Sequence, residues 1–248
     1  MFVSTDYLAI QYGVDDAIAK FFVDREPPAG NLYWKDKLLY LRFEPGYLFI
    51  PLMVDLMYKT GINRQQLLSE EFVQLMEAIG HISAQEEIKR FTHKEAIQQC
   101  IALARVVSKN DTYLHQLEQY FNEEPANLFS TYTTGINALH RGDLFLFAAC
   151  TLEEEQEVYL EIVKYWFALI SSLLLQDDAE DFKHDQEHNE PNAFIETGVD
   201  EAGIEQVRNL VKHNLQLIST LNKTMANKLD KQIITMFQKP FFQQLLQS

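Results

Sequence analysis

The stretch Tyr165–Leu175, with the sequence YWFALISSLLL, is the most apolar run in the chain and decides the fold class. It contains two serines and falls short of the roughly 18 apolar residues that a membrane span needs. We therefore expect a buried core helix over residues 152–176, followed by a polar loop to about Gly198. Residues 1–22 lack a basic region followed by an apolar block, so the sequence predicts no secretory signal and no membrane span.

The same helical periodicity continues along the rest of the chain. Apolar residues recur at spacings of three and four, and only 9 Gly and 7 Pro interrupt them, so the sequence predicts an all-α fold. We expect an antiparallel helical bundle around a central cavity. The helices that should line this cavity cover residues 47–59, 69–87 and 152–176. We expect one domain over residues 1–248, in which residues 1–45 form a loosely attached N-terminal segment.

Composition and charge restrict the class of partner. The 248 residues carry a formal net charge of -15, with a pI near 4.8, which argues against a nucleic-acid partner and against an anionic membrane surface. The only cysteines, Cys100 and Cys150, lie in apolar stretches and cannot form a disulfide framework. These features predict a cytoplasmic protein with reduced thiols.

Acidic residues are concentrated directly after the apolar run. Asp177, Asp178 and Asp181 stand where we expect the C-terminal end of the long helix, and the helix dipole disfavours carboxylates there. Asp177 and Asp181 are four residues apart and share a helix face, so they can converge on one Mg²⁺ ion. Two alternatives stay open: a solvated acidic loop, and a transition-metal cluster that uses Asp181, Asp185, His184 and His188.

Four landmarks, in this order, resemble the trans-isoprenyl diphosphate synthases, a polyprenyl synthetase family with the terpenoid synthase fold. Residues 46–54 (GYLFIPLMV) look like the family's GKRxRPxLV stretch, and residues 79–88 (IGHISAQEEI) look like the helix with its first aspartate motif. Residues 140–150 (HRGDLFLFAAC) and the acidic turn at 153–157 resemble the KTxxLF region. Residues 165–181 are similar to the long helix with the second aspartate motif. The resemblance implies an isoprenoid-synthase-like bundle from about residue 46 onward.

The resemblance also implies a ligand, a cofactor and a set of site residues. The ligand would be an isoprenyl diphosphate or a similar molecule with an apolar chain, and the cofactor would be Mg²⁺. The metal would be held by Asp177, Asp178 and Asp181 and, on the facing wall, by Glu86 and Glu87. Gln176, His140 and Arg141 would contact the substrate. A homodimer, or association with a partner subunit, is also implied, and no residue is assigned a catalytic role.

Several positions depart from the family pattern. Tyr47, Leu48 and Ile50 replace the cationic residues that hold the second diphosphate, and Glu86 and Glu87 replace the aspartate pair of the first motif. We therefore expect a protein that binds a Mg²⁺-diphosphate but is degenerate for chain-elongating condensation. If the protein is an enzyme, it should be prenyltransferase-like. The alternatives are a non-catalytic partner subunit of the same fold, and an acidic α-helical interaction protein.

Overall fold

The computed structural model describes residues 3–26, 28–32, 49–124, 127–239 and 242, and these residues form helices and connecting turns without a strand. The prediction of an all-α fold is thus confirmed. The α-helices are α1 (Thr5–Tyr12), α2 (Asp16–Asp24), α4 (Phe49–Lys59), α5 (Arg64–Leu67), α6 (Glu70–Glu87), α7 (His93–Val107), α8 (Asp111–Phe121), α9 (Gln156–His188), α10 (Ala193–Thr197), α11 (Glu201–Leu221) and α12 (Lys223–Phe237). Three 3₁₀ helices lie between α8 and α9: η2 (Leu128–Thr131), η3 (Asn137–His140) and η4 (Asp143–Thr151).

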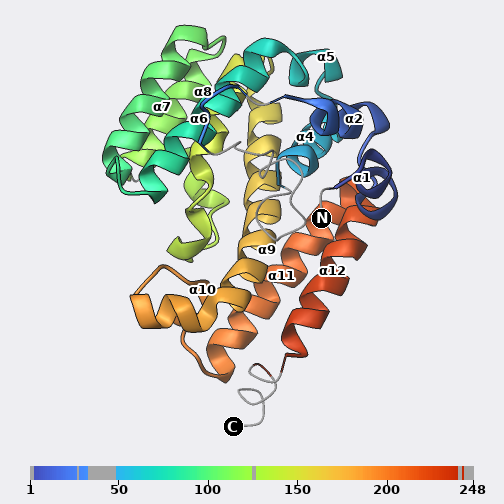
Figure 1. Ribbon diagram of the computed structural model, residues 1–248, viewed down its shortest axis with the longest axis vertical. Helices are drawn as coiled ribbons and strands as arrows, with labels where there is room; N and C mark the ends of the chain where they lie inside the picture. The colour runs from blue at the N-terminus through green and yellow to red at the C-terminus, as the bar shows by residue number, and fades with distance from the viewer. Residues whose placement is uncertain (1–2, 27, 33–48, 125–126, 240–241, 243–248) are drawn as a thin grey trace.

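Helix α9 is the central element of the bundle (Figure 1). Helices α6, α7 and α8 lie on one side of it and helices α11 and α12 on the other, while α4 packs directly against it (Figure 1). The apolar run Tyr165–Ile170 is buried in full, as expected of a core helix. By length and composition α9 is also the one helix in the described ranges that could cross a membrane, and 78% of its most apolar window is buried inside the protein.

The end of α9 differs from the sequence prediction. We expected this helix to end at Gln176, but it continues to His188, where Asn189 adopts a left-handed conformation and closes it. The reason is that its inner face continues past Gln176, because Ala179 and Phe182 are buried in the core at helical spacing. The acidic residues therefore lie within a helix, and the expected unfavourable interaction with the helix C-terminus does not apply to Asp177 and Asp178.

The described part of the N-terminal segment, residues 3–26, is firmly packed. Leu8, Tyr12, Ile18 and Phe22 are fully buried in the core, and the Arg25 guanidinium pairs with Glu77 of α6. The expected loose attachment is therefore not what residues 3–26 show; much of the rest of 1–45 lies outside the described residues.

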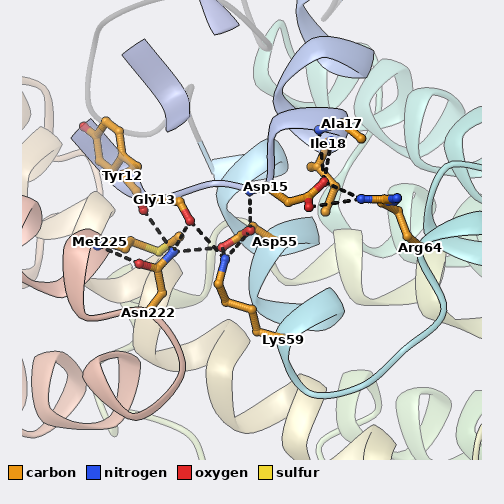
Figure 2. A network of polar contacts seen from close by, with 10 residues as sticks. All are labelled: Tyr12, Gly13, Asp15, Ala17, Ile18, Asp55, Lys59, Arg64, Asn222 and Met225. Atoms are coloured by element: carbon orange, nitrogen blue, oxygen red, sulfur yellow. Dashed lines mark hydrogen bonds and ion pairs between the residues drawn. The ribbon is translucent and has the colours of Figure 1, made fainter. Parts of the chain in front are cut away.

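A buried polar network joins the turn between α1 and α2 to α4 and to the start of α12 (Figure 2). Asp55 of α4 is fully buried, and its carboxylate accepts hydrogen bonds from the Asp15 backbone N–H (2.8 Å), the Lys59 ammonium and the Asn222 amide (2.8 Å). Asn222 also donates to the Tyr12 carbonyl oxygen, and its own side-chain oxygen caps α12 at Met225. Each of these polar groups has a hydrogen-bond or ion-pair partner inside the protein, so we assign the network a structural role. We call this network of Tyr12, Gly13, Asp15, Asp55, Lys59 and Asn222 the clasp.

Gly13 is required at the centre of this clasp. Its φ of +64° lies in the left-handed region, and a Cβ atom there would stand 2.9 Å from both the Asn222 side-chain oxygen and the Thr224 Cβ. Any other residue would therefore push the α1–α2 turn away from α12.

Candidate functional site

The acidic cluster that the sequence singled out lies on α9, beside η3 and α10. Asp178, the central aspartate, is 1% exposed. One carboxylate oxygen accepts a hydrogen bond from Arg141 Nη2 at 2.6 Å, and the other accepts one from the Ala193 backbone N–H at 2.6 Å. Each oxygen of Asp178 therefore has a partner from the protein itself.

Asn192 and Asp185 complete this arrangement. The Asn192 amide donates to the Asp178 carbonyl oxygen (2.7 Å) and to the Asp185 carboxylate (2.8 Å), while its side-chain oxygen caps α10. Arg141 donates a second hydrogen bond, to the Pro191 carbonyl oxygen at 2.6 Å. These contacts hold the turn between α9 and α10 against η3, so we assign Asp178 and Asp185 a structural role.

Asp177 and Asp181 have a different environment. Asp181 is exposed, and the Asp177 side chain is 42% exposed, with one oxygen 3.7 Å from Arg141 Nη2. The pKa of Asp177 is raised to about 6, first by burial and then by the neighbouring carboxylates of Asp178, Asp181 and Asp185, although Arg141 opposes the rise. A cation beside Asp177 would relieve this repulsion.

Glu86 and Glu87, expected on a facing metal-binding wall, lie at the C-terminal end of α6. The Glu86 carboxylate is 2.7 Å from His93 Nδ1 of α7 and raises the pKa of that imidazole, while Glu87 is exposed. None of the charged groups that act on Asp177 comes from α6. Across the described ranges, no three His, Cys, Asp or Glu side chains are grouped closely enough to hold a metal ion.

Each of the three residues expected to contact substrate already has an interaction partner within the protein. Arg141 pairs with Asp178, as described above. Gln176 is buried and donates to the Ser172 carbonyl oxygen at 3.0 Å. His140 Nε2 lies 3.1 Å from the Thr134 hydroxyl, the imidazole packs edge-on against Phe167, and burial lowers its pKa.

A small apolar cavity lies between the three helices that the sequence placed around it. It is lined from α4, α6, η4 and α9 by residues such as Met53, Met76, Phe145 and Trp166, and its volume is about 30 Å³. Pockets that hold drug-sized ligands have volumes of about 300 to 1,000 Å³. The cavity in this structure therefore has room for about one water molecule and not for an isoprenyl chain.

Three buried carboxylates were not singled out from the sequence: Asp55, Glu77 and Asp143, which lies at the start of η4. Asp143 has the following surroundings. Its carboxylate is 2% exposed and accepts hydrogen bonds from the Tyr120 hydroxyl (2.6 Å) and the Trp166 indole N–H (2.8 Å). Burial raises the pKa of Asp143 to about 7, and the hydrogen bonds from Tyr120 and Trp166, with the nearby His93, partly oppose the rise. Asp143 lies in the stretch 140–150 that resembles the KTxxLF region, and that local pattern does not distinguish a buried carboxylate from an exposed one.

Comparisons with protein-family models, curated proteins and solved structures found no match to this chain.

Proposed function

We propose that this protein is a helical binding protein that acts by holding a protein partner, the non-catalytic alternative among the functions expected from the sequence. The observation that carries the proposal is the position of Asp178. Both oxygens of the central aspartate accept hydrogen bonds from Arg141 and Ala193, so a metal ion at Asp178 would have to replace a buried ion pair.

Two further observations support a binding role. The apolar cavity between α4, α6 and α9 is about 30 Å³, far below the volume of a prenyl-chain site. The three-aspartate metal set implied by the family resemblance does not fit the structure either, because only Asp177 and Asp181 present carboxylates toward solvent. A non-catalytic partner subunit requires neither a large apolar cavity nor a three-aspartate metal site.

A second candidate function is binding of a Mg²⁺-diphosphate at Asp177 and Asp181. The raised pKa of Asp177, about 6, favours it, because carboxylates that repel one another gain from a shared cation. Mg²⁺ commonly uses one or two carboxylates and completes its coordination with water and phosphate oxygens.

Titration calorimetry with MgCl₂ and inorganic diphosphate separates the two candidates. The proposed function predicts no saturable heat, either for the native protein or for the Asp177→Asn/Asp181→Asn variant. Glu187→Gln/Glu190→Gln removes the same charge from the same acidic stretch and serves as the control. Saturable heat that is lost only in the aspartate variant would establish the second candidate. Formation of longer prenyl products from labelled isopentenyl diphosphate and an allylic diphosphate would overturn the non-catalytic proposal altogether.

A further inference from the structure

The charge of the chain reverses sign near its C-terminal end. Six of the 21 Lys and Arg residues, but only one of the 36 Asp and Glu residues, lie in residues 206–248. This segment therefore carries a net charge of +5, whereas residues 1–205 carry -20. All of its charged residues belong to α11, to α12 or to the residues directly after α12. Glu201 and Glu205, in the first turns of α11, lower the net charge of residues 201–248 to +3. The part of α11 that follows Glu205, together with α12, is thus basic on a strongly acidic protein.

A surface groove of about 520 Å³ runs between these two helices. Its lining combines two cations of α11, Arg208 and Lys212, with apolar residues of both helices: Val211, Leu215, Ala226, Ile233 and Phe237. The uncharged polar residues Gln216, Ser219 and Asn227 also line the groove. The inner faces of both helices pack on α9, so the groove lies on a supported surface.

Arg208 and Lys212 are positioned as a pair. They are four residues apart on α11, so they lie one turn, about 6 Å, from each other along the same face. The Arg208 guanidinium stands 5.1 Å from the centre of the Phe237 ring, which holds it over the groove. Within the described ranges no ion pair joins Arg208 or Lys212 to a carboxylate, and the one acidic group at the groove is Asp230 of α12.

From this geometry we infer that the groove between α11 and α12 is the docking site for an acidic amphipathic helix of a partner protein. The inference rests on the proposed binding function and names the surface and the partner's chemistry. A helix that lies in an apolar groove contributes apolar side chains at spacings of three and four. Carboxylates four residues apart beside that stripe would match Arg208 and Lys212. Local complementarity survives the overall negative charge, because salt screens charges beyond about 8 Å at physiological ionic strength.

A second copy of this chain is a poorer occupant. Among the described residues, the large exposed apolar side chains are scattered, and Leu103 and Val106 of α7 flank the cation Arg105. They do not form an apolar stripe bordered by carboxylates. The partner is therefore a different protein.

The probe for this inference is a fluorescently labelled peptide of about 18 residues, with leucine at helical spacings of three and four and glutamate beside it. Fluorescence polarisation should show saturable binding to the native protein. Arg208→Glu/Lys212→Glu should weaken binding at least tenfold, and Asp230→Lys should strengthen it. Lys223→Glu/Lys231→Glu makes the same charge change on exposed residues of α12 outside the groove, and it should alter binding by less than twofold. Circular dichroism confirms that each variant is folded.

Several binding outcomes would overturn the inference. They are no binding by the native protein, equal losses in the two charge-reversed variants, equal binding of a peptide in which lysine replaces every glutamate, and binding to phosphatidylserine vesicles that requires Arg208 and Lys212. Dimerisation that is lost only in Arg208→Glu/Lys212→Glu would assign the groove to a second copy and would also overturn it. The diphosphate assays test the proposed binding function separately. A failure of the groove inference can therefore be distinguished from a failure of the proposed function.

Discussion

The carboxylate of Asp178 lies 2.6 Å from Nη2 of Arg141, although the two residues are 37 positions apart in the chain. This ion pair connects the middle of α9 to the end of η3, and the second guanidinium nitrogen reaches the Pro191 carbonyl oxygen before α10. One arginine therefore joins three segments. Because Asp178 is engaged in this internal ion pair, we interpret it as a residue that stabilises the fold and not as a metal ligand.

Replacement of Arg141 by methionine should destabilise the protein substantially. Methionine retains much of the side-chain length but leaves Asp178 buried without its cation, which costs about 3 kcal/mol in comparable pairs. Urea unfolding, followed by circular dichroism, measures the change. Arg105→Met removes an exposed arginine paired with Glu118 and should cost less than about 1 kcal/mol. Similar losses in the two variants would contradict the structural role of the Arg141 pair.

Asn222→Ala should destabilise the protein by about 2 to 3 kcal/mol, because it removes a helix cap and leaves the buried Asp55 carboxylate with one donor fewer. Amide hydrogen exchange should also become faster in α1 and α2, which the same side chain ties to α12 through Tyr12. Asn227→Ala, at an exposed position on α12, serves as the control and should have little effect. If exchange in α1 were unchanged by Asn222→Ala, the clasp would not hold the N-terminal helices.

The stability of the protein should fall as the pH rises from about 4 to about 7, and Asp143 should be a main cause. Its pKa is about 7 in the folded protein and close to 4 when unfolded, so its contribution is fully present below pH 4 and is lost as the pH rises through 7. Asp143→Asn keeps an acceptor for Trp166 and should flatten the dependence of the unfolding free energy on pH. Asp111→Asn, at an exposed position, should leave the slope unchanged. An unchanged slope in the Asp143 variant would show that this carboxylate does not control it.

Neither cysteine should react with a thiol reagent in the native protein. Cys100 and Cys150 are fully buried, and burial raises the pKa of the Cys100 thiol to about 12 and that of Cys150 also well above its ordinary value. Titration with Ellman's reagent at neutral pH should therefore detect reactive thiols only after urea is added. Prompt modification of the folded protein would mean that the helices around these residues open readily.

Local sequence signals predicted the helices well where a cap coincided with an apolar face. Ser69 was expected to begin a helix that reaches residue 86 or 87, and it caps α6, which ends at Glu87. The end of α9 was predicted wrongly because the acidic residues obscured the apolar stripe that continues through Ala179 and Phe182. That stripe was present in the sequence and could have been found by its spacing.

The partners of the candidate site residues could not be predicted in the same way. Arg141 and Asp178 meet only because η3 and α9 pack together, and no spacing along the chain indicates that contact. Glu86 likewise finds His93 across the turn between α6 and α7. The sequence identified the ionisable residues, whereas tertiary packing determined which of them are neutralised by a partner. The isoprenoid-synthase relationship stays a prediction.

The clasp in Figure 2 has a consequence for the order in which the chain can fold during synthesis. Asp55 emerges from the ribosome 167 residues before Asn222, and its other partners alone cannot complete its hydrogen bonds. At a translation rate of about 5 to 20 residues per second, the delay is roughly 10 to 30 s. Throughout that interval α1 lacks the surface of α12 against which it packs. The buried face of α1, with Leu8 and Tyr12, therefore gains its final packing partner only when α12 has been made.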